Sequence, residues 1–217
     1  MTAGVFFDLD GTLADTAPDL GNALNRLRAA HNLPALPLAE LRPHTSSGVR
    51  GMLRAGFDIG PTAPEYESLR AHYLDLYEAA LCEQTVLFPG MTDVLEALEA
   101  RHIPWGVVTN KTSRFARPLM QRMRLIQRLA CLVCGDTTPE AKPSPLPLLH
   151  AAELAGVSPR DCCYVGDDKR DIDAGRAAGM RTIAVRWGYL GVDDPIEAWN
   201  ADDLIDSPTE LKLLLSL

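Results

Sequence analysis

Five short runs of apolar, β-prone residues constrain the fold of this chain more than any other feature. The runs are Val5 to Phe7, Trp105 to Val108, Ala130 to Val133, Cys162 to Val165 and Thr182 to Val185. Each run is nearly continuously apolar rather than alternating, which is typical of strands that are buried on both faces of a parallel sheet. Helical patterns precede the later runs, at Met91 to Arg101, Phe115 to Met123, Pro145 to Ala155 and Ile172 to Ala178. This alternation predicts an α/β fold with a doubly wound parallel sheet.

The stretch between residues 15 and 84 interrupts the alternation. It contains helix-like patterns and no convincing strand. The patterns are Leu20 to Ala30, Gly48 to Phe57 and Glu65 to Leu81. We therefore expect a Rossmann-like core formed by residues 1–14 and 85–217, with residues 15–84 inserted after the first strand as a helical cap.

Composition narrows the class of ligand. The 217 residues carry a formal net charge of −8, which argues against a broad nucleic-acid-binding face, because such surfaces need clustered Lys and Arg. No apolar stretch approaches the ~20 residues that a membrane helix needs, and the N-terminus lacks the regions of a signal peptide. We expect a protein that binds a small molecule and neither nucleic acid nor membrane, with a monomer as the default.

The cysteines indicate a reducing compartment. There are five, an odd number without the spacing of a disulfide framework, and Cys162 and Cys163 are adjacent in an apolar run. This pattern favours buried, reduced thiols in the cytoplasm. Cys131 and Cys134 form a CxxC inside another apolar run, which favours a buried strand, although redox or metal use stays open as the alternative.

Two carboxylates follow the first apolar run. Asp8 and Asp10 lie two residues apart, where a buried strand opens into a loop, and Gly11 allows a sharp turn after them. Neighbouring carboxylates repel, so either one keeps a proton or a cation binds between them. An ionised carboxylate can attack or bind a metal, and a protonated one can act as a general acid.

Polar residues also follow the later runs. They are Thr109, Asn110 and Lys111 after the second run, Asp167, Asp168 and Asp171 after the fourth, and Lys142 before a helix. Because ligands bind at the carboxyl ends of the strands in open α/β sheets, we expect these groups to converge. Together they supply oxygen ligands for a hard cation, donors for phosphate oxygens and one positive charge.

These segments resemble the four motifs of the haloacid dehalogenase superfamily of phosphotransferases. The motifs here are Asp8-Leu-Asp10-Gly-Thr12, Thr109, Lys142-Pro143 and Gly166-Asp167-Asp168 with Asp171. All four occur in the family's order, and the resemblance extends over essentially the whole chain. It implies a Mg²⁺-dependent enzyme in which Asp8 is the nucleophile and a metal ligand. Asp10 would be the acid and base, with its backbone carbonyl on the metal, and Asp167 a further metal ligand that Asp168 and Asp171 support.

The same resemblance implies how phosphate and substrate are held. Thr109, Asn110 and Lys142 would bind the phosphate, and Arg50 in the turn Thr45 to Arg50 would contact the rest of the substrate. A simple helix cap is the alternative for that turn. The closest branch is that of the phosphoglycolate phosphatase-like enzymes, which implies a small phosphomonoester as substrate; N-acetylmuramic acid 6-phosphate or another sugar phosphate is the alternative.

Other functions and structural roles stay open. The family's mutases carry a His twelve residues after the nucleophile, where this chain has Leu20, so hydrolysis is favoured over transfer to another acceptor. A binding protein without turnover is a further alternative. Singly, Thr109 could cap a loop, Asp167 and Asp168 could cap a helix, and Lys142 could be a solvated charge. We expect Lys111 and Arg170 to be exposed on the surface, with a place at the border of the pocket as the alternative for each.

Overall fold

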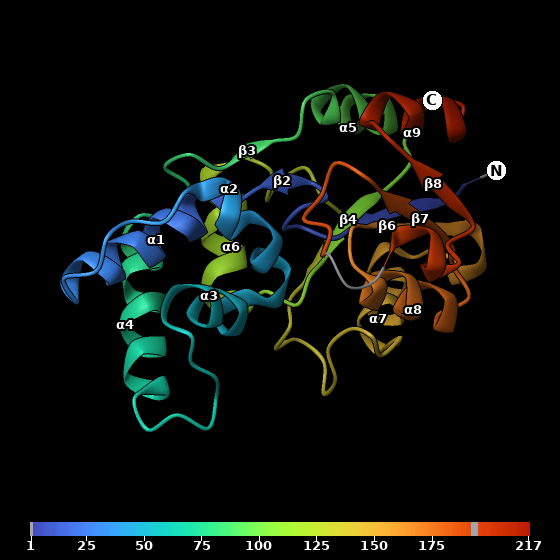
Figure 1. Cartoon of the computed structure of the whole chain (residues 1–217). Helices are drawn as coiled ribbons and strands as arrows, with labels where there is room; N and C mark the ends of the chain where they lie inside the picture. Colours follow the sequence, from blue (N-terminus) through green and yellow to red (C-terminus); the bar gives the residue numbers. More distant parts are fainter. Residues whose placement is uncertain (1, 192–194) are drawn as a thin grey trace.

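A six-stranded parallel sheet forms the centre of the molecule (Figure 1). The computed structural model describes residues 2–191 and 195–217, so Met1 and residues 192–194 of the predicted core lie outside the described residues. The strands, in spatial order, are β5 (Cys131–Val133), β4 (Trp105–Val108), β1 (Gly4–Phe7), β6 (Cys162–Gly166), β7 (Arg181–Val185) and β8 (Asp203–Ile205). The prediction of a doubly wound parallel sheet is confirmed.

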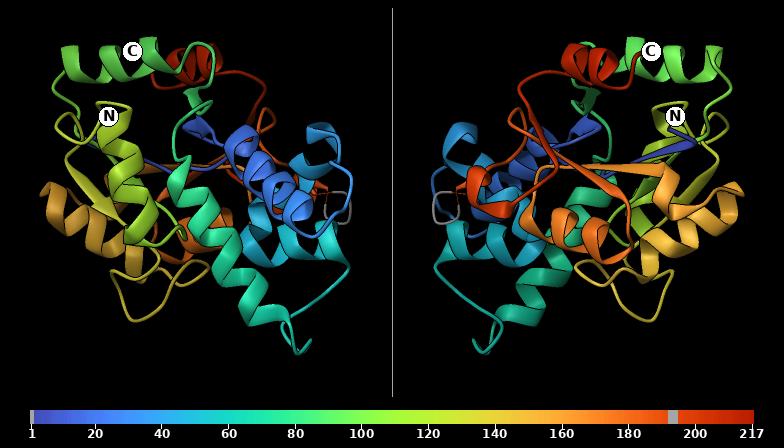
Figure 2. Two further views of the ribbon diagram at one scale, coloured as in Figure 1. Left: turned by 90° about the vertical axis from the view of Figure 1, so that its left-hand side faces the viewer. Right: turned by 90° about the vertical axis from the view of Figure 1, so that its right-hand side faces the viewer.

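Helices cover both faces of this sheet because its strands are apolar on both sides. Val5 and Phe7 of β1 belong to one hydrophobic cluster and Phe6 to another. The first cluster includes residues of α5 (Met91–Ala100), α6 (Ser113–Arg122) and α9 (Pro208–Leu214), and the second includes residues of α7 (Leu146–Ala155) and α8 (Lys169–Ala177). Both side views show α5 and α9 next to each other above the sheet (Figure 2).

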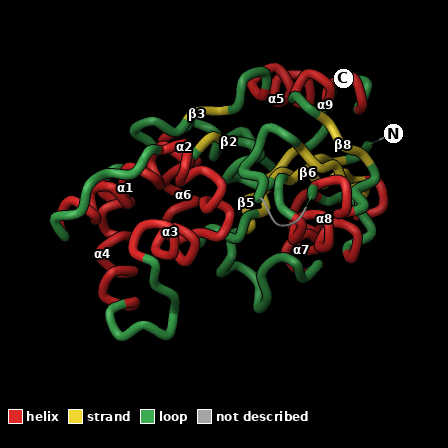
Figure 3. Tube along the Cα trace, viewed as in Figure 1, coloured by secondary structure: helices red, strands yellow, loops and turns green. Residues whose placement is uncertain are grey.

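The chain between β1 and α5 forms a helical layer beside the sheet (Figures 1 and 3). Its elements are α1 (Ala17–Ala30), α2 (Leu38–Leu41), a 3-10 helix η1 (Arg42–Ser47), α3 (Gly48–Phe57) and α4 (Tyr66–Ala79). The connections that enter and leave the layer pair antiparallel as β2 (Ala14–Asp15) and β3 (Val86–Leu87). The core and cap boundaries stay a prediction, although Asp15 lies in a strand that the sequence did not indicate.

Several predicted elements differ from the observed ones only at their ends. The five predicted strands agree with the structure to within one residue at each end, and α3 agrees throughout. Helices α1 and α8 begin three residues earlier than predicted, because Ala17-Pro18-Asp19 and Lys169-Arg170-Asp171 contain no large apolar residue that would continue the periodic pattern. The sequence analysis did not anticipate β8 or the 3-10 turn Ile196–Trp199. No helix among the described residues is long and apolar enough to cross a membrane.

Asp19 joins the beginning of the helical layer to its end, and this predicts a large contribution to stability. Its carboxylate accepts hydrogen bonds from the backbone N–H groups of Gln84 and Thr85, at 2.8 and 3.0 Å, and from the Thr85 hydroxyl at 2.6 Å. Asp19→Ala leaves the two buried donors of Thr85 without a partner, so we expect the free energy of unfolding to fall by about 2–4 kcal/mol. Urea-induced unfolding followed by circular dichroism measures this change.

The matched control is Asp93→Ala, which removes an exposed carboxylate from the first turn of α5. It loses only a favourable interaction with the helix dipole, about 0.5 kcal/mol. Equal losses of stability in the two variants would show that the bonds of Asp19 contribute nothing beyond surface charge.

Candidate active site

The polar segments that follow β1, β4, β5 and β6 meet at one edge of the sheet. Their strands are adjacent in the order β5, β4, β1, β6 and all run in the same direction. Asp8 directly follows β1, Thr109 directly follows β4 and Asp167 directly follows β6. Parallel strands place their carboxyl ends together, which is why residues more than a hundred positions apart in the sequence become neighbours.

Lys142 lies at the centre of this group with only 3% of its side chain exposed. Its ammonium nitrogen donates to Asp8 Oδ1 at 2.8 Å and to Asp171 Oδ1 at 2.7 Å. It also contacts the Val108 carbonyl oxygen at 3.0 Å and the Tyr164 hydroxyl at 2.7 Å. Burial alone would lower the pKa of Lys142, but the two carboxylates raise it above its usual value. The solvated charge considered as an alternative is therefore excluded.

Asp167 is held between two glycines. A Cβ atom on Gly11 or on Gly188 would lie 2.2 Å from an atom of the Asp167 side chain, and Gly11 has a φ of +88°. The carboxylate accepts from the Thr12 hydroxyl at 2.7 Å and from the Tyr189 N–H at 2.8 Å. Gly11 and Thr12 therefore hold the Asp167 side chain in place, although Asp167 is distant from them in the sequence.

Asp168 and Asp171 begin α8 as a capping box. The Asp168 side chain accepts from the backbone N–H of Arg170 at 2.9 Å, and Asp171 Oδ2 accepts from the N–H of Asp168 at 3.2 Å. The helix cap considered as an alternative thus holds for Asp168, but not for Asp167. Asp171 has a second role, because its other oxygen binds Lys142.

Lys111 is buried against Asp10, which corrects the expectation of an exposed side chain. Its side chain is 8% exposed, and its ammonium donates to Asp10 Oδ1 at 2.8 Å and lies 4.9 Å from the centre of the Tyr77 ring. The same Asp10 oxygen accepts from the Thr16 hydroxyl at 2.6 Å. The sequence pattern suggested a surface residue because the partners of Lys111, Asp10 after β1 and Tyr77 on α4, become its neighbours only in the folded chain.

Thr109 and Asn110 differ in what their side chains do. The Thr109 hydroxyl lines the pocket and accepts from the backbone N–H of Lys111 at 3.1 Å, as the loop-capping alternative suggested. The Asn110 side chain pairs with the backbone of Lys142, donating to its carbonyl at 2.9 Å and accepting from its N–H at 3.0 Å. Asn110 therefore positions the segment of Lys142, and it also lines the cavity. Its part in phosphate binding stays a prediction.

The acidic residues at this edge suit a divalent cation. Asp8, Asp167 and Asp171 each offer a carboxylate oxygen, and these oxygens lie within 4.8 Å of one another. Burial, together with the charge of Asp8, raises the pKa of Asp167 well above its usual range. Burial also raises the pKa of Asp171 to about 7, against the effect of Lys142. Burying several carboxylates this close together raises the free energy of the folded chain unless a cation neutralises them, and hard cations prefer oxygen ligands.

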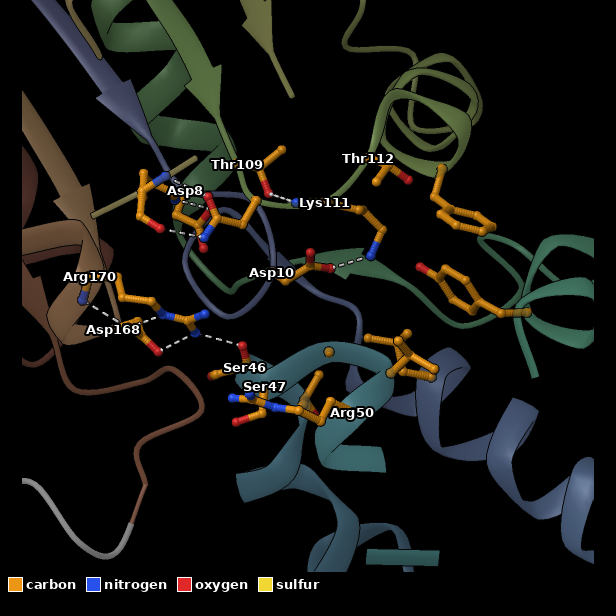
Figure 4. Close-up of a pocket in the computed structure, with 18 of the residues that line it drawn as sticks. Asp8, Asp10, Ser46, Ser47, Arg50, Thr109, Lys111, Thr112, Asp168 and Arg170 are labelled. Atoms are coloured by element: carbon orange, nitrogen blue, oxygen red, sulfur yellow. Dashed lines mark hydrogen bonds and ion pairs between the residues drawn. The ribbon is translucent and has the colours of Figure 1, made fainter. Parts of the chain in front are cut away.

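A cavity of about 350 Å³ lies between this cluster and the helical layer. Figure 4 shows Ser46, Ser47 and Arg50 on the side of the pocket opposite Asp8 and Thr109. The Arg50 guanidinium has no hydrogen-bond or ion-pair partner within the described part of the chain, and Ser47 makes no side-chain hydrogen bond that caps α3. The turn thus lines the pocket, and the simple helix cap is not what the structure shows.

Arg170 links the core to this turn, and 41% of its side chain is exposed, in agreement with the expectation of a surface residue. It donates to both carboxylate oxygens of Asp168, at 2.7 and 2.8 Å, and to the Ser46 carbonyl oxygen at 2.7 Å. Its side chain is partly exposed, yet it lines the same cavity. A residue at the beginning of α8 therefore fixes the position of η1.

A sequence model for haloacid dehalogenase-like hydrolases matches residues 5–185. The chain belongs to the haloacid dehalogenase-like hydrolase family. The family that the four motifs predict is confirmed, and the matched residues include Asp8, Lys142 and Asp167.

Named relatives of this haloacid dehalogenase-like hydrolase are phosphatases. It is 47% identical over 208 residues to the phosphoglycolate phosphatase of Xanthomonas campestris pv. campestris, covering 95% of this chain and 93% of that protein. It is 43% identical over 207 residues to the N-acetylmuramic acid 6-phosphate phosphatase of Pseudomonas aeruginosa, covering 95% and 92%. The crystal structure of a predicted phosphoglycolate phosphatase from Haemophilus somnus 129PT matches with a TM-score of 0.86 and 26% identity, covering 100% of this chain and 98% of that one. The predicted enzyme class is confirmed.

The sequence analysis of this hydrolase missed two tyrosines in the site. The Tyr164 hydroxyl, buried in β6, accepts from Lys142 and donates to the Val108 carbonyl at 2.7 Å. A tyrosine inside a fully apolar strand needs a hydrogen-bond partner, and this signal was available. The Tyr189 hydroxyl accepts from the N–H groups of Thr16 and Ala17 at 2.6 and 2.9 Å. No local pattern could reveal that contact, because the partners are more than 170 residues apart.

The raised pKa values of Asp167 and Asp171 predict that Mg²⁺ stabilises this hydrolase more at high pH. Without a cation, the folded chain holds these protons more tightly than the unfolded chain, so its free energy of unfolding falls as pH rises from the unfolded pKa near ~3.9 through the raised folded values. Mg²⁺ competes with the protons. We expect saturating MgCl₂ to raise Tm more at about pH 8 than at about pH 5.

Differential scanning fluorimetry with MgCl₂, and with NaCl at equal ionic strength as the control, measures this difference. An equal rise in Tm at both pH values would contradict a cation site made of these carboxylates.

Proposed function

We propose that this protein is a Mg²⁺-dependent phosphatase that hydrolyses a small phosphomonoester through an aspartyl-phosphate on Asp8. The observation that carries the proposal is the buried Lys142 ammonium, which binds Asp8 beside Asp167 at the wall of the cavity. Phosphoryl transfer chiefly requires in-line positioning and neutralisation of oxygen charge. Lys142 and a cation held by the carboxylate cluster would position the phosphate and neutralise the charge on its oxygens.

Asp8, Asp167 and the backbone carbonyl of Asp10 are the groups that would hold Mg²⁺. Asp171, whose two oxygens accept hydrogen bonds from Lys142 and from Asp168, would support this group. When bound, the cation would neutralise charge on the phosphate oxygens. The remaining contributions come from the chain itself, with the Thr109 hydroxyl and Lys142 holding the phosphate.

Asp8 and Asp10 have different roles in the proposed reaction. Asp8 Oδ1 accepts from Lys142, and its other oxygen has no hydrogen-bond partner among the described residues, which suits attack on phosphorus. The bond to the ester oxygen breaks, and Asp10 gives that oxygen a proton. Asp10 then takes a proton from a water molecule that attacks the phosphorus, which releases inorganic phosphate and restores Asp8.

Leu20 supports hydrolysis over transfer to another acceptor. It lies twelve residues after Asp8, is buried in the first helix of the helical layer and lines the cavity. An apolar side chain there can exclude bulk water but cannot exchange a proton with a second sugar hydroxyl. A binding protein without turnover would have no use for a buried lysine that pairs with the nucleophile.

Phosphoglycolate is the first candidate substrate, and N-acetylmuramic acid 6-phosphate or another sugar phosphate is the second. The first is supported by the relative that is 47% identical. The second is supported by the relative that is 43% identical and by the cavity of about 350 Å³, which is larger than a two-carbon ester needs. Arg50 and Arg70 both line this cavity and could meet the carboxylate of either compound.

The chain's location and assembly are also inferred. All five cysteines are free, and burial raises the pKa of Cys131 to about 12, which disfavours the thiolate needed for redox chemistry. This supports action in the reducing cytoplasm. The monomeric state stays a prediction.

Phosphate release from a panel of esters tests the proposed reaction. With 2-phosphoglycolate, N-acetylmuramic acid 6-phosphate, hexose phosphates and p-nitrophenyl phosphate, we expect Mg²⁺-dependent release that EDTA abolishes, with one ester preferred in kcat/KM. Asp8→Asn should lower kcat by about 10⁴ or more, because an amide oxygen is a poor nucleophile and removes the covalent route.

The fold of Asp8→Asn is checked by circular dichroism. Substantial turnover by a folded Asp8→Asn protein would exclude the covalent mechanism, and no release from any ester by the parent protein would exclude the phosphatase.

Arg50 is predicted to select acidic substrates. We expect Arg50→Ala to raise KM for the preferred acidic ester roughly tenfold, the loss of one charge-assisted hydrogen bond, and to change KM for p-nitrophenyl phosphate little. The matched control is Arg54→Ala, one turn further along α3, because Arg54 pairs loosely with Asp58 at 3.4 Å and lies outside the cavity. Equal effects of Arg50→Ala on both esters would remove Arg50 from specificity.

A further inference from the structure

A buried hydroxyl without a partner lies in the wall of the cavity. Among the buried polar side-chain atoms of residues 2–191 and 195–217, the Tyr77 hydroxyl oxygen is the one that lacks a hydrogen-bond partner. Tyr77 is 2% exposed, and its ring packs against Phe115 with centroids 5.5 Å apart. Such a hydroxyl lowers stability, and phenylalanine would fill the same space without that cost. The Lys111 ammonium is near Tyr77 and opposes the rise in its pKa, but it makes no hydrogen bond with the hydroxyl, which can therefore take a partner from outside the chain.

The position of Tyr77 indicates where in the cavity an outside partner of its hydroxyl would bind. One face of α4 lines the cavity through residues at helical spacing, namely Arg70, Tyr73, Leu74 and Tyr77. Tyr73 is satisfied, because its hydroxyl donates to the Leu20 carbonyl at 3.1 Å. Tyr77 differs, because its ring lies beneath the Lys111 ammonium, which in turn contacts Asp10. Tyr77 is thus next to the residue that protonates the leaving group in the proposed reaction.

Tyr77 and Lys111 together offer donors to one ligand. Burial raises the pKa of Tyr77 to about 12, so the phenol remains a neutral donor at physiological pH. The Lys111 ammonium has three N–H groups, and Asp10 accepts from it through one oxygen. The Tyr77 oxygen is covered, and the flexible Lys111 side chain lies over the ring. A ligand that draws the ammonium toward itself would therefore also gain access to the hydroxyl.

We infer that the Tyr77 hydroxyl and the Lys111 ammonium form a subsite for a carboxylate on the leaving group, with one donor for each oxygen. A carboxylate fits better than a hydroxyl, because it brings two acceptors and no further proton that would need a partner. The surrounding Leu20, Leu74 and Phe115 exclude water, which strengthens a charge-assisted hydrogen bond. This subsite rests on the proposed function, since it places the leaving group beside Asp10.

A pair of esters and a pair of tyrosine variants test the subsite. The esters are 2-phosphoglycolate and 2-hydroxyethyl phosphate, which differ in the carboxylate. We expect the parent protein to prefer 2-phosphoglycolate in kcat/KM, and Tyr77→Phe to lower that preference about tenfold, mainly through KM. Tyr73→Phe, on the same helix face, should leave the preference unchanged.

Thermal unfolding separates this role from a structural one. Tyr77→Phe should be at least as stable as the parent, because it removes an unpaired hydroxyl, whereas Tyr73→Phe should have a lower Tm. An unchanged preference in Tyr77→Phe, a lower Tm in that variant, or a parent protein that hydrolyses both esters equally would overturn the subsite and leave the phosphatase intact. No release of phosphate from these two esters or from any ester of the panel above would instead overturn the proposed function.

Discussion

The buried ammonium of Lys142 is the interaction on which the active site depends. It binds Asp8 and Asp171 and contacts the last residue of β4 and the Tyr164 hydroxyl of β6. A single charge thus ties together the carboxyl ends of three adjacent strands. Without it, carboxylates from β1 and α8 would repel at close range in a region of low polarity, and their burial would be unfavourable.

A second set of contacts extends this centre toward the helical layer. Asp167 fits between Gly11 and Gly188, and the N–H that binds it belongs to Tyr189. The hydroxyl of the same tyrosine accepts from the first N–H groups of α1, and its carbonyl accepts from the Ser46 hydroxyl. Tyr189 therefore joins Asp167, the proposed metal ligand, to α1 and η1 of the helical layer. The same residue thus helps to position both the cation site and the substrate pocket.

The pocket also shows how an acidic protein can bind an acidic ligand. The net charge of −8 is spread over the whole chain, whereas Lys111, Arg50, Arg70 and Arg170 all line one cavity. Lys111 and Arg170 are neutralised by Asp10 and Asp168, while Arg50 has no partner within the described residues. The local balance of charge, rather than the total, is what a phosphorylated ligand would meet.

The sequence by itself determined the sheet, the family and the ordered set of Asp8, Thr109, Lys142 and Asp167, because strands buried on both faces leave continuous apolar runs whose polar ends must meet. It did not reveal β8 or the pair formed by β2 and β3, which are too short to show a period. Only the tertiary structure decided which way single side chains point. Lys111 is buried rather than exposed, the Asn110 side chain binds the backbone of Lys142, and the Tyr77 hydroxyl makes no hydrogen bond within the described residues. These outcomes depend on contacts between distant segments, which no local pattern in the sequence encodes.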